Sequence, residues 1–194
     1  MEDQLLVAKT LLKCYPHLDD LFETLHRCSE ECVGSGFYAL FPIEQMRLYE
    51  RIYEYERRKL GVYNMKYLIE ESFRRGKGSA LSLLKDRFIY HKEMNELMER
   101  YHVSLRTCYR YIKKGLSEFS KGLESLGYDK KRVLCEYGNE PLFLTILNRV
   151  IKEDDWEEEK EKERADERRI NSRPLPYQFY RACAFCEGER APRG

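Results

Sequence analysis

Apolar residues recur along most of the chain at the three- and four-residue spacing of amphipathic α-helices. The strict alternation of apolar and polar residues that is typical of β-strands is nearly absent. Glycine and proline, which interrupt regular structure, are sparse at 11 and 6 residues among 194. The pattern therefore predicts an all-α fold built as a helical bundle.

Residues that break or cap helices divide this pattern into segments. We expect Pro16 to split the first segment in two, Gly61 to end one helix before the next begins, and Ser79 to cap a later one. Gly127 is the predicted C-terminal stop of the longest helix in the second half of the chain. The expected helices cover residues 3–32, 43–60, 63–74, 80–90, 92–99, 104–126 and an amphipathic segment that begins near residue 141.

Changes in composition divide the chain into four parts. Residues 1–77 form an N-terminal helical region, and residues 78–134 form a second region of short helices. Residues 135–170 run from an amphipathic helix into one that is almost purely charged. Residues 171–194 contain three prolines and no helical periodicity, which predicts a flexible tail.

Positive charge is concentrated in one of these parts. The formal net charge of the whole chain is only +1, yet residues 78–134 contain 12 Lys and Arg against 7 Asp and Glu, a local net charge of +5. Localised positive charge is the footprint expected where a protein contacts nucleic-acid phosphates. A basic helical face that is merely solvated is the alternative interpretation.

The same basic part contains the layout of a helix-turn-helix. One predicted helix ends near Glu99, a short connection leads through His102, and Val103 follows as an apolar plug. Ser104 is then a suitable N-cap for a longer helix. A supporting helix, a tight turn and a second helix form the unit that places a recognition helix in the major groove of DNA.

The second helix of this unit separates into a basic and an apolar face. At 100° per residue, Arg106 and Arg110 fall on one side and Ile112 and Phe119 on the other. Arginine is the side chain best suited to guanine, so we assign the reading of base edges to Arg106, Tyr109 and Arg110. We assign phosphate contacts to Ser104, Thr107, Lys113 and Lys114.

Several phrases of this part resemble a known family. Residues 84–89, the phrase Glu96-Leu-Met-Glu-Arg-Tyr-His-Val-Ser104 and the pair Gly115-Leu116 look like region 4 of bacterial sigma factors. More narrowly, they are similar to the sigma-like helix-turn-helix proteins of Firmicutes and their phages. His102 stands where the family usually has glycine, and Met98 where it usually has a small residue. The resemblance covers a quarter to a third of the chain, and residues 1–77 show no match to sigma region 2.

The resemblance implies a bacterial or phage transcriptional regulator that binds a specific double-stranded DNA sequence, with RNA polymerase as a candidate partner. Two other functions use the same observations. The first is a phage DNA-packaging or assembly protein, similar to a terminase small subunit, which would form a homo-oligomer. The second is a protein-interaction module without DNA binding, in which residues 1–77 or 154–170 hold the partner.

The remaining chemistry of the sequence favours a protein that is not an enzyme. No recognisable catalytic set and no cofactor motif occur, and we interpret the tyrosines of residues 49–55 as core and surface residues. Cys183 and Cys186 form half of a zinc-binding motif without a second pair, so we expect no metal. Seven scattered cysteines and an acidic N-terminus predict a cytoplasmic protein. No apolar run approaches the roughly 20 residues of a membrane span.

Overall fold

The computed structural model describes residues 2–36, 41–76 and 78–153. Within these ranges nearly all residues are helical and no β-strand occurs, so the predicted all-α bundle is confirmed. None of the described helices is both long enough and apolar enough to cross a membrane. The predicted charged helix, the tail and the cysteines Cys183 and Cys186 lie outside the described residues.

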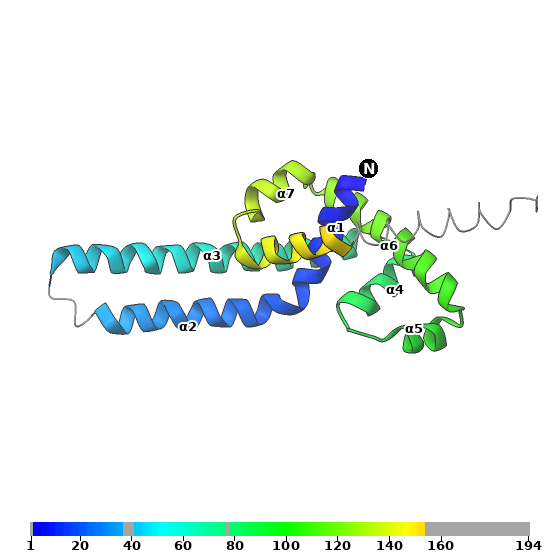
Figure 1. The fold of residues 1–194 in the computed structure, drawn as a ribbon, viewed down its shortest axis with the longest axis horizontal. Coiled ribbons are helices and arrows are strands. Elements are labelled where there is room, and N and C mark those ends of the chain that lie inside the picture. Colours follow the sequence, from blue (N-terminus) through cyan, green and yellow to red (C-terminus); the bar gives the residue numbers. More distant parts are fainter. Residues whose placement is uncertain (1, 37–40, 77, 154–194) are drawn as a thin grey trace, which may run out of the picture. The chain divides into compact units, whose positions relative to one another are not determined.

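The helices follow one another closely along the chain (Figure 1). Their bounds are α1 (Glu2–Cys14), the 3-10 helix η1 (Tyr15–His17), α2 (Leu18–Gly36), α3 (Pro42–Arg75), α4 (Ser79–Phe88), α5 (Met94–Tyr101), α6 (Leu105–Ser125) and α7 (Lys130–Tyr137). A further helix begins at residue 141 and is described through residue 153. It is the yellow, unlabelled helix of Figure 1.

Two predicted helix boundaries had opposite outcomes. Pro16 does interrupt the first segment, where η1 separates α1 from α2. The predicted stop at Gly61 is wrong, because α3 continues through this residue for 34 residues in all. A glycine inside a helix costs only about 1 kcal/mol relative to alanine. The buried neighbours Val62, Met65 and Ile69 pack onto the rest of the protein and outweigh that cost.

Two other helix starts differ from the prediction. Ser79 does not cap α4 but is its first residue, and the N-cap position is held by Gly78 at a φ of 141°. Only glycine adopts such a φ without strain. Helix α7 was not predicted, although Asp129 caps it by accepting a hydrogen bond from the backbone N–H of Arg132 at 2.8 Å. Asp129 was therefore the missed sequence signal.

One large core joins the two halves that composition had separated. Buried side chains from α1, α2, α3, α4, α6, α7 and the helix that begins at 141 all belong to it. Phe73 of α3 and Phe119 of α6, for example, stack with ring centroids 4.9 Å apart. Residues 1–77 and 78–134 therefore share this large core, and residues 1–152 form one compact unit.

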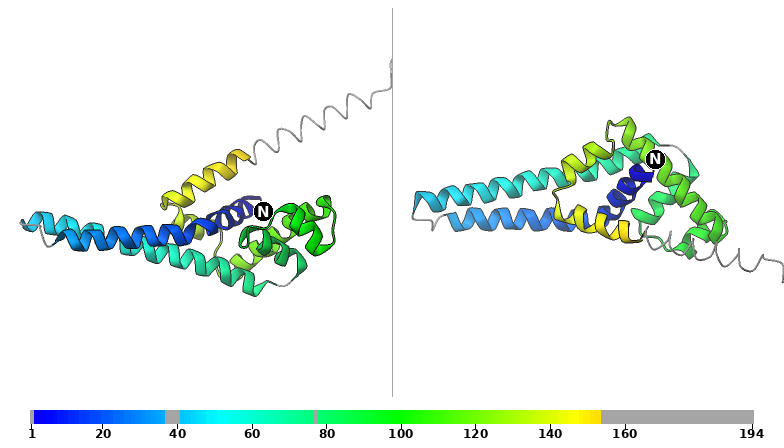
Figure 2. Two further views of the ribbon diagram at one scale, coloured as in Figure 1. Left: turned by 90° about the horizontal axis from the view of Figure 1, so that it is seen from below. Right: turned by 45° about the horizontal axis from the view of Figure 1, so that its top comes forward.

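Helices α2 and α3 form a long antiparallel hairpin, which we call the arm. They lie side by side in all three views (Figures 1 and 2). Polar contacts also link them, since Lys66 Nζ donates to Asp19 Oδ1 at 2.6 Å and Ser29 Oγ donates to Glu56 Oε1 at 2.7 Å. The three-helix group α4–α6 lies at the end of the arm away from the α2–α3 connection (Figure 1).

Glycines allow α6 to cross its neighbours at very short distance. A Cβ placed on Gly115 would lie 2.5 Å from the carbonyl oxygen of Ala80 in α4. A Cβ on Gly122 would lie 2.9 Å from the carbonyl oxygen of Ser72 in α3. At these two crossings the helix backbones touch, so any side chain would force the helices apart.

We expect Gly115→Ala to destabilise the protein and Gly61→Ala to stabilise it. The first change adds a methyl group against backbone atoms of α4 and should cost roughly 1–3 kcal/mol in the free energy of unfolding. The second adds a methyl group where no atom lies within 4 Å, and it removes a helix-interior glycine, for a gain of about 0.5–1 kcal/mol. Urea unfolding followed by circular dichroism measures both, and equal effects of the two changes would contradict the close crossing.

Candidate nucleic-acid interface

Helices α4, α5 and α6 pack around a small core of their own. Leu83 of α4, Leu97 of α5 and Cys108 of α6 are completely buried there. Burial raises the pKa of the Cys108 thiol. Partly buried side chains surround these three, namely Met94, Met98, Tyr101, Val103, Tyr111 and Ile112. This is the arrangement of a helix-turn-helix with a supporting helix, as the sequence predicted.

The turn between α5 and α6 is short and passes through His102, as the sequence predicted. His102 adopts the left-handed conformation, with φ 50° and ψ 46°, at the position where the sigma family usually has glycine. The backbone N–H of Val103 donates to the carbonyl oxygen of Met98 at 3.1 Å. The Val103 side chain turns into the small core, so it closes the turn from inside.

The N-terminus of α6 is capped within the turn. Ser104 Oγ accepts a hydrogen bond from the backbone N–H of Thr107, and the two hydroxyl groups lie 3.1 Å apart. One hydroxyl proton is used in that mutual bond, so only the other is free for a phosphate oxygen. The predicted phosphate contacts at Ser104 and Thr107 therefore provide one hydroxyl donor between them.

A buried carboxylate, missed by sequence reasoning, fastens α4 to α5. Asp86 is only 4% exposed, and its Oδ2 accepts a hydrogen bond from the hydroxyl of Tyr101 at 2.9 Å. Arg100 Nε lies 3.3 Å from the same oxygen, and Lys92 Nζ lies 3.4 Å from Oδ1. Burial, followed by the hydrogen bond to Asp86, raises the pKa of Tyr101 to about 12. Only the fold brings these groups together, because in the sequence they are separated by up to 15 positions.

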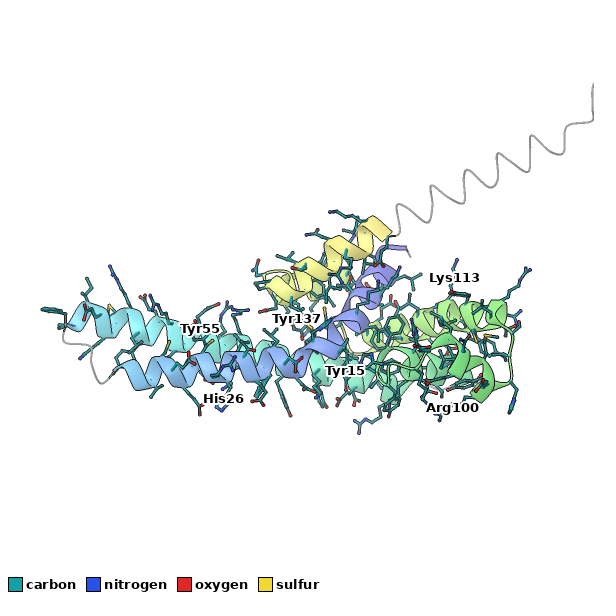
Figure 3. The ribbon with its side chains drawn as sticks, turned by 60° about the horizontal axis from the view of Figure 1, so that its bottom comes forward. Tyr15, His26, Tyr55, Arg100, Lys113 and Tyr137 are labelled. Carbon is teal, nitrogen blue, oxygen red and sulfur yellow. The ribbon has the colours of Figure 1, made fainter. Side chains whose placement is uncertain are left out.

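Helix α6 has the two faces that its periodicity predicted. Cys108, Gly115, Phe119 and Leu123 are buried against the cores. The predicted DNA-contacting side chains on the other face are exposed, namely Arg106, Tyr109, Arg110, Lys113 and Lys114. Tyr109 is 59% exposed. Figure 3 shows Lys113 projecting from α6 on the side away from Arg100.

The cations on this face are electrostatically unmatched. Within the described residues, Arg106, Arg110, Lys113 and Lys114 make no hydrogen bond or ion pair with another side chain. Neighbouring cations do have partners, since Arg100 faces Asp86 and Arg132 faces Glu136. The first turn of α6 also contains no acidic residue that would offset the positive end of the helix dipole. The face therefore presents uncompensated positive charge to solvent.

Comparisons of the chain with protein-family models, with curated proteins and with solved structures found no match. The resemblance to sigma region 4 therefore depends on the sequence phrases between residues 84 and 116 alone.

We expect Tyr101→Phe to weaken the attachment of α4 to α5. Losing one donor to a buried carboxylate should cost about 1 kcal/mol in the free energy of unfolding near neutral pH. The folded-state pKa of Tyr101 is raised above its ordinary value of 10.0, so this stabilisation is fully present below about pH 10 and is lost as the pH rises through about 12.

Urea titrations of both proteins between about pH 8 and pH 12 measure this difference. Tyr109→Phe is the matched control, because Tyr109 is exposed and should show no effect at any pH. A wild type and a Tyr101→Phe variant of equal stability at pH 8 would contradict the role of the hydrogen bond.

Proposed function

We propose that α6 is a recognition helix that enters the major groove of duplex DNA and that the protein is a sequence-specific transcriptional regulator. The observation that carries this proposal is the exposed, unpaired cationic face of α6 within a capped three-helix helix-turn-helix. A basic helix face that only contacts water could equally well have acidic side chains paired with its cations. Among the described residues, the four cations of the exposed α6 face have no acidic partner, whereas Lys92 and Arg100 are paired with Asp86.

The positions along α6 suit different kinds of DNA contact. Arg106 and Arg110 lie one turn apart near the start of the helix, which is the part of a recognition helix that meets base edges. Tyr109 lies between them on the exposed face. Lys113 and Lys114 lie further along, where the helix leaves the groove and passes the phosphate backbone.

The resemblance to sigma region 4 favours transcription over other uses of DNA binding. That region reads a promoter element, so RNA polymerase is the candidate protein partner. Selection of bound sequences from a pool of random duplexes tests the function directly. We expect enrichment of one short motif, and a protein that binds no duplex even at low salt would refute the proposal.

We expect Arg106→Ala and Arg110→Ala to impair DNA reading without affecting folding. Each should cost roughly 1–3 kcal/mol of binding and relax the base preference at one position of the selected motif. The melting temperature should hardly change, because exposed substitutions usually alter stability by about 0.5 kcal/mol or less. Phe119→Ala should do the opposite and cost about 3–5 kcal/mol of stability, because Phe119 is completely buried.

Thermal melting and binding titrations of each variant separate the two effects. Arg27→Ala in α2 is the matched control, since it removes an exposed, unpaired arginine far from α6 in the chain. If Arg110→Ala lowered the melting temperature as much as Phe119→Ala and left base preference intact, α6 would not be a recognition helix.

We expect Lys113→Ala and Lys114→Ala to weaken specific and random duplexes equally. A phosphate contact carries no sequence information, and its loss should lower the slope of log affinity against log salt by about 1 for each lysine. Fluorescence anisotropy over a range of salt concentrations gives these slopes, again with Arg27→Ala as the control. An altered base preference in either lysine variant would place that lysine in the groove.

A further inference from the structure

A line of large apolar side chains runs along α3 and is largely exposed to solvent. We call it the α3 stripe, and its members are Met46, Tyr49, Tyr53, Leu60, Tyr63 and Tyr67. Each is between 58% and 70% exposed. Of the tyrosines expected to divide between core and surface, Tyr49 and Tyr53 lie on the surface and Tyr55 packs against the core. Monomeric proteins rarely leave such a continuous row uncovered.

The spacing of the stripe is that of a helix that packs lengthwise on another helix. Its members follow at intervals of three and four residues, and position 56 is the one place in the series without an apolar side chain. The Glu56 carboxylate at this position accepts hydrogen bonds from Ser29 of α2 and from Lys59 of α3 itself. An average repeat of about 3.5 residues keeps one seam facing a partner helix along its whole length.

Helix α2 does not cover the α3 stripe. The α3 residues that contact or face α2 include Tyr55, Lys59 and Lys66, which lie about 110° around the helix from the middle of the stripe. Near its C-terminal end, the stripe borders a shallow groove in which Tyr63 and Tyr67 lie beside Phe22 of α2. Such a groove can receive side chains from a helix laid along the stripe.

The stripe also has much of the area that a stable dimer needs. A tyrosine side chain buries roughly 150–250 Å², so the four tyrosines at about two-thirds exposure provide roughly 400–650 Å² per chain, to which Met46 and Leu60 add. A standard protein interface buries about 800 Å² on each partner. The stripe therefore supplies the larger part of the area of a standard interface.

We infer that the α3 stripe is a homodimer interface, in which a second copy of this chain packs its own α3 antiparallel along the first. The charges beside the stripe favour this partner and this direction. Glu50 and Arg57 lie on the same edge, seven residues apart, and both are exposed. An antiparallel copy brings Glu50 of each chain beside Arg57 of the other, so the ion pair forms twice. Arg57 has only an exposed pair with Glu54 in the single chain, and such pairs contribute little.

This interface is independent of the proposed DNA contact. Helix α6 meets α3 beyond the stripe, at Ser72 and Phe73, so both surfaces can be occupied together. A two-fold dimer would also carry two copies of α6, and dimeric helix-turn-helix proteins bind paired half-sites. The dimer is therefore tested without DNA, and its failure would leave the recognition helix of the single chain unaffected.

Analytical ultracentrifugation of the full chain, without DNA, tests the dimer. We expect a dimer in the wild type that dissociates on dilution, and a dissociation constant at least about 100-fold higher in the double variant Tyr53→Glu with Leu60→Glu, which places unpaired carboxylates in the seam. Arg51→Glu is the matched control, because it changes the net charge by the same amount on the opposite flank of α3 and should leave the dimer intact. Circular dichroism should show equal helix content in all three proteins.

Charge reversal tests the direction of the pairing. Glu50→Arg alone and Arg57→Glu alone should each weaken the dimer by about tenfold, since each places like charges together twice. The two changes combined should restore the wild-type dissociation constant. A wild type that is monomeric at tens of micromolar, or a dimer that the stripe double variant leaves unchanged, would overturn the inference. Failure of the combined variant to recover would refute the antiparallel arrangement.

Discussion

The close crossing of α6 over α4 and α3 is the contact on which the rest of the described fold depends. Gly115 and Gly122 bring the backbone of α6 against the carbonyl oxygens of Ala80 and Ser72. Without a Cβ at the crossings, the apolar face of α6 contributes Phe119 to the large core and Cys108 to the small one. Helix α6 is therefore packed against the cores along one face, and its opposite face remains in solvent.

The charges of the helix-turn-helix also differ between its packed side and its exposed side. Asp86 is buried between α4 and α5, where it forms ion pairs with Lys92 and Arg100 and fixes the end of α5 through Tyr101. The exposed cations of α6 have no such partner among the described residues. Paired charges thus hold the supporting helix rigidly, while unpaired charges remain available to an anionic ligand.

The arm offers a surface of a different chemical kind. Its solvent-facing stripe is aromatic and apolar, and exposed patches of more than a few hundred Å² commonly mark protein interfaces. The bond between Lys66 and Asp19 holds α2 to another face of α3, so the six side chains of the stripe stay exposed. The proposed DNA contact and the proposed dimer contact therefore lie on separate helices, α6 and α3.

The sequence by itself determined the features that depend on residues within one or two helical turns. The left-handed turn at His102, the cap at Ser104 and the two faces of α6 follow from hydrogen bonds and periodicity that span a few residues. The tertiary structure alone decided that α3 runs unbroken through Gly61, that Asp86 meets Tyr101, and that Tyr49 and Tyr53 face solvent while Tyr55 packs against the core. These outcomes depend on which helices come to lie side by side, because packing between distant segments outweighs the small local preferences that a sequence pattern records.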